Sequence, residues 1–529
     1  MPYLLHDLTQ HAARNFAHKE ALLFKTEVVN YQTLNERIKV TAKGLLALGI
    51  KPSERIAIYL PKCIESVVSM FACSVTGACF VPINPVLTAQ QVNHILADCS
   101  VRILITSSAR LKQLEGVLSQ CVHLQTVVLV DWIKVDAISL PLINIIQWDD
   151  IQSKCIEQPE FSRHDTDVAA ILYTSGSRGH PKGVMLSHRN LLLGAKSVAK
   201  YLNNTADDRI LAVLPLSFDY GLSQLTTAFS VGATVVLMDY LLPRDVIKAI
   251  VCYQITGLAA VPPLWIQLAP LDWPEEARQS LRYFTNSGGT LPVEILNALR
   301  QKLPNSQAFL MYGLTEAFRS TYVPPEALDS HQASIGIAIP NADVRVLHED
   351  GSECDDNEPG ELVHSGELVS LGYWNSPEKT AECFKAIPAT ASGKPASNWA
   401  LWSGDTVIRA KDGFLSFVGR KDDMIKTSGY RVSPNEVEEL VYHSGLVKEV
   451  VALGVAHPML GQAIVLLVVP ENKALENKTL VSYCKKNLPN FMQPACIEIN
   501  IALARNQNGK IDRKGLSLQY SDLFSELKK

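Results

Sequence analysis

The chain has 529 residues and a formal net charge of −4; 47% of its residues are hydrophobic and 19% are charged. This length exceeds that of a single hydrophobic core, so we expect several domains or subdomains of a folded protein. The nearly balanced charge provides no strongly basic surface, so neither nucleic acid nor an anionic membrane is an expected partner.

The cysteines and apolar segments limit where the protein is expected to work. The 11 cysteines are odd in number and never form a C-x-x-C pair, which argues against a disulfide framework or a zinc site. The N-terminal segment MPYLLHDLTQHAARNF lacks the charged start and apolar core of a secretory signal. Apolar runs such as 463–469 are shorter than the roughly 20 residues of a membrane helix. We therefore predict a cytoplasmic enzyme.

Short apolar runs alternate with longer segments of helical period along the first half of the chain. We predict buried strands at 55–60, 102–106, 126–130, 209–215, 234–238 and 257–261. We predict helices at 65–76, 88–98, 189–201 and 243–252. This alternation is typical of an α/β fold whose sheets are mostly parallel.

The sequence changes character towards residue 360, where glycines punctuate short strands. This pattern predicts a small β-rich subdomain at about 340–419. The charged string RKDD at 420–423 is typical of a linker, so we place the main boundary between Gly419 and Arg420. Strands at 450–455 and 463–469, with helices at 434–443 and 478–486, predict a small α+β domain after it. The predicted domains are 1–419 and 420–529.

A segment rich in glycine and hydroxyl residues, LYTSGSRGHPKGV, occupies positions 172–184 and follows a predicted strand at 168–172. We expect a helix after it, with Ser187 as the N-cap. A loop between a strand and a helix can bind phosphate through backbone N–H groups, although it can also be a surface loop that binds nothing. Pro181 before Lys182 breaks the Walker A pattern. The expected phosphate contacts are Thr174, Ser175, Gly176, Ser177, Gly179 and Lys182.

The pattern T-S-G-S-x-G-x-P-K-G in this loop resembles the signature of the adenylate-forming family, which includes acyl-CoA synthetases, amino-acid adenylation domains and luciferases. Five further motifs follow in the order of that family: NSGG at 286–289, MYGLTE at 311–316, WSGD at 402–405, GRKDDMIKTSGYR at 419–431 and NGKIDR at 508–513. The resemblance implies a large ATP- and acid-binding domain followed by a small mobile domain. It also implies two half-reactions: a carboxylate attacks the α-phosphorus of ATP, and a thiol then displaces AMP.

The resemblance implies roles for individual residues. Adenylation brings two negative groups together, so their charges must be neutralised. Glu316 would bind Mg²⁺, Thr315 would donate to the α-phosphate, and Lys510 would bridge that phosphate and the acyl carboxylate. Asp405 would accept hydrogen bonds from the ribose, and Arg420 would reach the ribose or a phosphate. The adenine would contact Gly288, Gly289, Tyr312 and Gly313. Outside these motifs, Tyr312 would be read as a core aromatic residue and Lys510 as a surface lysine.

The resemblance further implies that the small domain rotates between the half-reactions. Asp422 would be the hinge, and the region of Lys426 and Gly429 would form a channel for the thiol. Coenzyme A and the phosphopantetheine of a carrier protein present the same reactive arm. A carrier protein would act in trans, because only 16 residues follow Arg513.

The acid pocket is expected around the segment LPLSFDYGLSQ at 214–224, which resembles the F-D-x-S segment of amino-acid adenylation domains. A buried Asp219 would need a cation, either the ammonium of an amino-acid substrate or Arg319. Other expected wall residues are Tyr220, Ala260, Phe284 and Met311. Charges beside the pocket favour a small or polar acid over a long-chain fatty acid.

Three functions stay open at this point. The first is an acyl-CoA synthetase, the second is a stand-alone enzyme that loads an acyl or aminoacyl group on a carrier protein, and the third is a degenerate nucleotide-binding protein. The stretches 217–237 and 313–326 also resemble bacterial acyl-CoA ligases associated with exopolysaccharide-export genes, without identifying a substrate. Arg178 stands where the family has threonine, and its role is open.

Overall fold

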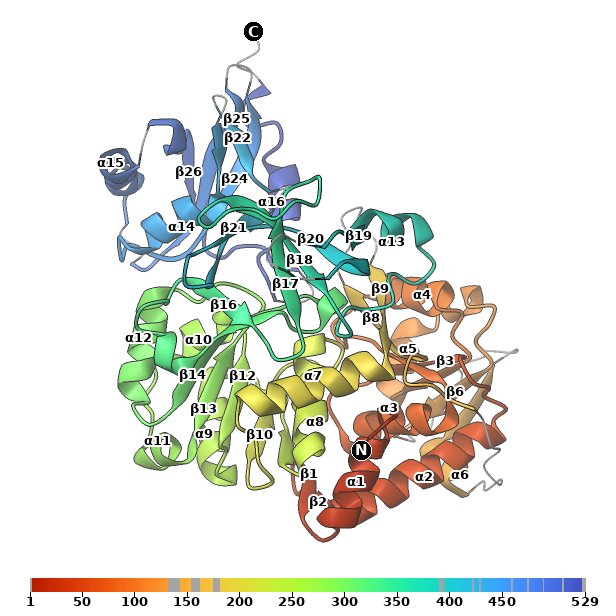
Figure 1. Cartoon of the computed structure of the whole chain (residues 1–529). Coiled ribbons are helices and arrows are strands. Elements are labelled where there is room, and N and C mark those ends of the chain that lie inside the picture. Colours follow the sequence, from red (N-terminus) through yellow and green to blue (C-terminus); the bar gives the residue numbers. More distant parts are fainter. Residues whose placement is uncertain are drawn as a thin grey trace.

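The computed structural model describes residues 2–131, 143–153, 162–174, 181–389, 393, 395–420, 423–427, 430–457, 460–472, 475–488, 490–506 and 509–525. These residues form three sheets with helices packed against them, and the C-terminal part lies at one end of the larger N-terminal part (Figure 1). The mixed α/β architecture predicted from the sequence is confirmed. In the described residues, no helix combines the length and hydropathy needed to cross a bilayer.

The first sheet has the order β7-β6-β5-β3-β4-β8-β9 and is parallel except for the β8–β9 pair. Its central strands are short apolar runs such as ILIT and TVVL, buried along their whole length. Its strands are β3 (Arg55–Tyr59), β4 (Cys79–Pro82), β5 (Ile103–Thr106), β6 (Thr126–Leu129), β7 (Asn144–Gln147), β8 (Val168–Thr174) and β9 (Lys182–Ser187). Its helices are α3 (Ile64–Thr76), α4 (Ala89–Asp98), α5 (Ser108–Leu114) and α6 (Trp148–Ser153).

The segment 172–184, predicted as a loop that leads directly into a helix, contains the end of β8 and the start of β9. β8 and β9 pair antiparallel, with Thr174 opposite Lys182, and residues 175–180 between them lie outside the described residues. Val184 and Leu186 are buried on β9, an alternation that a strand requires. Helix α7 (His188–Tyr201) begins after β9, and the Ser187 hydroxyl accepts from the N–H of Asn190 at 3.1 Å. The predicted N-cap is therefore confirmed.

The second sheet is the largest and combines two kinds of pairing. One half has the order β14-β13-β12-β10-β11-β1 and is parallel; β2 adds an antiparallel edge. Its strands are β1 (Glu20–Phe24), β2 (Glu27–Asn30), β10 (Arg209–Ala212), β11 (Thr234–Leu237), β12 (Gly257–Ala260), β13 (Tyr283–Asn286) and β14 (Gln307–Tyr312). The helices in this part of the chain are α1 (Asp7–Asn15), α2 (Tyr31–Ala47), α8 (Asp219–Val231), α9 (Pro243–Tyr253), α10 (Pro262–Leu268), α11 (Glu275–Ser280) and α12 (Val293–Lys302).

The other half of this sheet is antiparallel and corresponds to the predicted β-rich subdomain. It lies between the parallel half and the C-terminal part in Figure 1. Its strands are β15 (Thr321–Val323), β16 (Ser334–Ala338), β17 (Asp343–Leu347), β18 (Pro359–Ser365), β19 (Phe384–Ile387), β20 (Ser397–Arg409) and β21 (Leu415–Arg420), with α13 (Pro377–Cys383) beside β19. The predicted boundary at Gly419 and Arg420 falls at the end of β21 and stays a prediction.

The C-terminal part has its own sheet and core. The sheet order is β23-β22-β25-β24, and β26 pairs parallel with β25. The strands are β22 (Ile425–Thr427), β23 (Tyr430–Val432), β24 (Val447–His457), β25 (Gly461–Pro470) and β26 (Cys496–Ile499). The helices are α14 (Pro434–Tyr442), α15 (Asn477–Asn487) and α16 (Arg513–Gln519). The strands and helices predicted here agree with the structure to within three residues.

Candidate active site

Lys510 extends from the C-terminal part towards the end of β13 in the large part. A Cβ added to Gly288 would lie 3.5 Å from Cε and 3.9 Å from Nζ of Lys510, so the end of the lysine side chain lies within van der Waals range of this glycine. Lys510 itself remains exposed to water. The surrounding protein displaces part of the water around the ammonium group, which lowers the pKa of Lys510, whereas the negative charge of Asp219 raises it. The structure thus brings together a lysine and a glycine that are far apart in the sequence.

A second group is built by β20, β21 and β14. The register places Asp405 opposite Arg420, and their Oδ1 and Nε atoms are 3.2 Å apart. The Tyr312 hydroxyl donates a hydrogen bond to the other carboxylate oxygen of Asp405. Burial raises the pKa of Asp405, and Arg420 and Tyr312 oppose that shift. The side chain of Arg420 is 55% exposed and that of Asp405 only 5%, so the guanidinium is the accessible part of the pair.

A third group surrounds Glu316 in the short helix η2 (Thr315–Ala317). The Tyr373 hydroxyl donates to Oε1 of Glu316 at 2.8 Å, and Lys182 Nζ lies 5.2 Å from the centre of the Tyr373 ring. Burial lowers the pKa of Lys182. Tyr373 therefore connects the base of the β8–β9 hairpin to Glu316. Tyr373 was not among the site residues predicted from the sequence, because it stands in none of the motifs.

Asp219, the first residue of α8, is paired with Arg319. Nη1 of Arg319 donates to Oδ2 of Asp219 at 2.5 Å, and the Thr315 hydroxyl donates to Oδ1 at 3.2 Å. The Arg319 side chain is 2% exposed and that of Asp219 is 16% exposed. The sequence allowed either a substrate ammonium or Arg319 as the cation beside Asp219, and the structure places Arg319 there.

A strained turn holds Arg319 in this place. The N–H of Arg319 donates to the carbonyl of Ala317 at 2.7 Å, and Phe318 between them has a φ of 57°. A γ-turn of this kind is rare and costs energy for a residue with a side chain. The Phe318 ring packs over α7, where a Cβ on Gly194 would lie 2.3 Å from ring atoms. Packing of Phe318 against Gly194 therefore supports the turn that aims Arg319 at Asp219.

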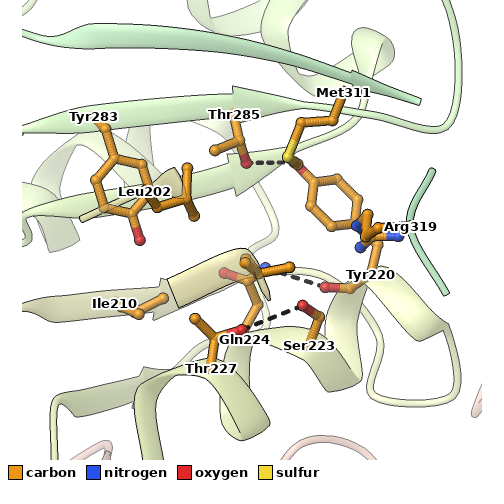
Figure 2. A pocket seen from close by; sticks show the side chains of 11 residues that line it. Leu202, Ile210, Tyr220, Ser223, Gln224, Thr227, Tyr283, Thr285, Met311 and Arg319 are labelled. Carbon is orange, nitrogen blue, oxygen red and sulfur yellow. Dashed lines mark hydrogen bonds between the residues drawn. The ribbon is translucent and has the colours of Figure 1, made fainter. Parts of the chain in front are cut away.

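A cavity opens beside the Asp219–Arg319 pair, between α7, α8 and the strands β10, β13 and β14 (Figure 2). Its lining residues are Val198, Leu202, Ile210, Tyr220, Ser223, Gln224, Thr227, Tyr283, Thr285, Met311 and Arg319. Three of the predicted wall residues, Tyr220, Met311 and Arg319, are among them.

Ala260 and Phe284 do not line this cavity, and their predicted place in the wall of the acid pocket stays a prediction. Side chains alternate along a strand, and on β13 it is Tyr283 and Thr285 that face the cavity. Phe284 points the other way and packs on Trp265, with ring centres 5.1 Å apart. Ala260 is fully buried at the end of β12.

The remaining predicted positions divide into two sets. Thr174 ends β8, Gly289 accepts a hydrogen bond from Asn286 through its carbonyl at 3.0 Å, and Gly313 follows β14 beside Arg319. The positions outside the described residues are Ser175, Gly176, Ser177, Arg178, Gly179, Asp422 and Gly429, together with the side chain of Lys426. Their predicted roles stay predictions.

Comparison with known families identifies two matching models. The AMP-binding enzyme family matches residues 9–374, and the AMP-binding enzyme C-terminal domain matches residues 436–510. The second match ends at Lys510 itself.

Two relatives from different enzyme classes are each 30% identical to this chain. A long-chain-fatty-acid–CoA ligase of Salmonella typhimurium strain LT2 is 30% identical, over 96% of this chain and 93% of that protein. An L-proline–[L-prolyl-carrier protein] ligase of Pseudomonas fluorescens strain Pf-5 is also 30% identical, over 98% of this chain and 99% of that protein.

Solved structures share the fold across the chain. An anthranilate CoA ligase in complex with anthranoyl-AMP has a TM-score of 0.87 at 22% identity and covers 99% of each chain. The o-succinylbenzoate CoA synthetase of Bacillus subtilis with ATP and magnesium has a TM-score of 0.81 at 26% identity, covering 96% of this chain and 98% of the other. With both family models matched and relatives aligned over nearly its whole length, the chain belongs to the AMP-binding enzyme family.

Proposed function

We propose that this protein is an AMP-forming ligase that activates a carboxylic acid with ATP and transfers the acyl group to coenzyme A. The position of Lys510 at Gly288 is the observation that supports this most strongly. A lysine delivered by the C-terminal part meets the glycine that follows β13, with Asp219, Asp405, Arg420 and Glu316 near enough to influence its pKa. This arrangement gathers charges where an acid and a phosphate would meet.

The first half-reaction joins two anions, so positive charge must lie between them. A carboxylate oxygen of the acid attacks the α-phosphorus, and the bond to the β-phosphate oxygen breaks as pyrophosphate leaves with the electron pair. The Lys510 ammonium would contact both the carboxylate and the α-phosphate, and Thr315 would add a hydroxyl donor. Binding of two anions beside Lys510 favours its charged form and offsets the lowering of its pKa by the protein.

The nucleoside would lie along the β14–β20 side of the cleft. Oδ1 of Asp405 is ion-paired with Arg420 at 3.2 Å and accepts no hydrogen bond within the described residues, so it has a lone pair left to accept from a ribose hydroxyl. Arg420 lies beside it with an exposed guanidinium that can pair with the same ribose or with a phosphate. Tyr312 has its hydroxyl bound to Asp405, so only its ring face is offered to adenine.

Glu316 is suited to hold Mg²⁺ together with the phosphates of ATP. Mg²⁺ is commonly bound by one or two carboxylates plus substrate phosphates, and Glu316 is a carboxylate oriented by Tyr373 beside Lys182. When bound there, the ion would neutralise phosphate charge and make pyrophosphate a better leaving group.

The second half-reaction requires Lys510 to give way to a thiol. The thiol sulfur attacks the acyl carbon of the adenylate, and AMP leaves with the electrons of the bond to its phosphate oxygen. We propose rotation of the C-terminal part about Asp422, bringing the region of Lys426 and Gly429 to the cleft. The pair His443–Glu294, 3.5 Å apart and exposed on both sides, is a weak contact across the two parts that would not prevent this rotation.

Loading of a carrier protein in trans is the second candidate. The equal identity to a prolyl-carrier protein ligase favours it. Activation of an amino acid through Asp219 is disfavoured, because Arg319 already neutralises that carboxylate and leaves no unpaired charge for an α-ammonium group. We therefore expect the activated substrate to be a carboxylic acid without an α-ammonium group, whether the thiol belongs to coenzyme A or to a carrier protein.

The test is ATP–pyrophosphate exchange with Mg²⁺ over a panel of carboxylic acids and amino acids, followed by mass spectrometry after addition of coenzyme A. Exchange with carboxylic acids and formation of the thioester with coenzyme A are expected. Exchange without thioester would support the carrier-protein candidate, and exchange with amino acids alone would overturn the acyl-CoA ligase. A protein that binds ATP but exchanges with no acid would be a degenerate nucleotide-binding protein.

A further inference from the structure

The cavity beside Asp219 contains hydrogen-bond donors that have no partner in the protein. Arg319 uses Nη1 for Asp219 and for the carbonyl of Phe318, at 2.5 and 2.9 Å. Its Nε and Nη2 atoms are buried without a hydrogen-bond partner, although the side chain is 2% exposed and lines the cavity. Buried donors of a charged group are costly to leave unpaired, so a site that keeps them is suited to a ligand that accepts from them.

The guanidinium is also fixed in direction. Its carbon atom lies 4.6 Å from the centre of the Tyr220 ring, and Tyr220 in turn hydrogen-bonds Thr285 at 2.5 Å through its hydroxyl. Figure 2 shows Arg319 and Tyr220 together at one end of the cavity, with Tyr283 and Leu202 at the other. A stacked and ion-paired arginine keeps its donors in one plane, which gives directional recognition of an acceptor.

The size and polarity of the cavity restrict which chemical group can supply a hydrogen-bond acceptor to Arg319. The cavity has about 10 Å³ of free volume, about enough for one water molecule. Ser223, Gln224 and Thr227 place a polar face of α8 on one side of it. This volume admits one water-sized group, such as a hydroxyl or carbonyl oxygen, and no carbon chain, and an apolar group in it would leave Nε and Nη2 of Arg319 unpaired.

Charge decides between a neutral and an anionic acceptor. The ion pair with Asp219 already balances the positive charge of Arg319. A second carboxylate on the substrate would bring an uncompensated negative charge into a buried site, which is unfavourable. A carbonyl or hydroxyl oxygen can accept from Nε or Nη2 without adding charge.

We propose that this cavity is a specificity subsite for the neutral oxygen of a short hydroxy or oxo acid, which enters the cavity and accepts a hydrogen bond from Arg319. This inference rests on the proposed function, since it assigns an oxygen-bearing group to the acid that the ligase activates. It makes Arg319 a specificity-determining residue, distinct in role from Lys510.

The test compares matched acids in ATP–pyrophosphate exchange with the full-length enzyme: pentanoate, its 3-, 4- and 5-hydroxy forms, its 3- and 4-oxo forms, glutarate and palmitate. We expect at least one hydroxy or oxo acid to exceed pentanoate in kcat/KM by at least about 10-fold, and also to exceed glutarate and palmitate. If pentanoate, glutarate or palmitate has a kcat/KM equal to or above that of every hydroxy and oxo acid, this inference is overturned while the proposed function stands. Absence of exchange with all acids would count against the proposed function as well.

Variants separate recognition of the oxygen from general damage. Arg319→Lys keeps a cation for Asp219 but loses the planar set of donors, and we expect the preference for the oxygenated acid to fall by about 10-fold while the KM for ATP is unchanged. Arg300→Lys, at a partly exposed ion pair with Asp329 outside the cavity, is the matched control, and we expect it to leave the preference unchanged. An unchanged preference in a folded Arg319→Lys enzyme would overturn the role of Arg319. If Arg319→Lys fails to fold, the acid series on the wild-type enzyme decides.

Discussion

Nη1 of Arg319 lies 2.5 Å from Oδ2 of Asp219, and this buried pair connects the motif at 311–316 to the first turn of α8. Breaking a buried ion pair at one partner leaves an uncompensated charge, which costs about 3–5 kcal/mol. Arg319→Met is therefore expected to lower the free energy of unfolding by that amount. The double variant Asp219→Asn, Arg319→Met should recover part of the loss, because no charge is left unpaired. Urea unfolding of Asp219→Asn, Arg319→Met and the double variant checks this. A loss of unfolding free energy in the double variant equal to the sum of the two single losses would contradict the coupling.

Lys510→Ala should separate the two half-reactions. It removes the ammonium from the cleft, so ATP–pyrophosphate exchange should fall by about 100-fold or more. Thioester formation from a supplied acyl-adenylate and coenzyme A should persist, because the proposed rotation withdraws Lys510 before that step. Lys514→Ala, a change in the following helix α16, is the matched control and should leave both steps intact. Equal loss of both half-reactions would contradict the role given to Lys510.

Gly288→Ala should impair the first half-reaction through its side chain. The new Cβ would be in van der Waals contact with Cε of Lys510, at 3.5 Å, and would occupy space beside the lysine where the acyl-adenylate is proposed to form; the φ of +80° adds a strain of about 1–2 kcal/mol. Gly413→Ala is the control, because Gly413 has a φ of +88° and no atom within 4 Å of the added Cβ. The two variants should lose similar stability by thermal unfolding, but only Gly288→Ala should slow exchange. Equal exchange in both would show that Gly288 is a turn residue alone.

Tyr373→Phe should weaken the binding of the Mg²⁺ that the first half-reaction requires. The variant removes the 2.8 Å hydrogen bond to Glu316, and a hydrogen bond to a charged group contributes about 1.5–3 kcal/mol. The Mg²⁺ concentration at half-maximal exchange should therefore rise by about 10-fold or more. Tyr322→Phe, at a partly buried tyrosine of β15, is the control. A Mg²⁺ titration of exchange measures the shift; an unchanged midpoint would argue against Glu316 as the metal ligand.

Buried histidines should make the protein sensitive to mild acid. Burial lowers the pKa values of His6, His188 and His364 from 6.5 to about 4. A histidine with a lowered pKa stabilises the fold while it is neutral, above pH 6.5, and this contribution is lost as the pH falls towards 4. Each histidine accounts for up to about 3.4 kcal/mol over that window, at 1.36 kcal/mol per pKa unit.

The measurement is the free energy of unfolding between pH 7 and pH 4 for wild type and for His364→Gln. The variant should lose about 3 kcal/mol less over this range, because Gln does not titrate and can still hydrogen-bond Ser320 as His364 does at 3.0 Å. His11→Gln on the exposed face of α1 is the control. The same pH dependence in wild type and His364→Gln would contradict the prediction.

Much of the fold was predictable because its signals are local. Runs such as ILIT at Ile103–Thr106 bury every side chain, which only a strand between covering layers can do, and the motif order indicated the family. The strand β9 was missed because the glycines before it favour a loop, and its alternation of Val184 and Leu186 is short.

The candidate site depended on contacts that only the tertiary structure decides. The chain alone identified Asp219, Arg319, Gly288 and Lys510 as site residues, because each stands in or beside a motif. It did not determine that Tyr283 and Thr285, not Phe284, face the cavity, since the alternation of a strand has two possible phases and packing selects one. The partner of Asp219 and the meeting of Lys510 with Gly288 depend likewise on residues 100 and 222 positions apart in the chain. Sequence therefore identified the candidate residues, and the folded contacts decided which of them meet.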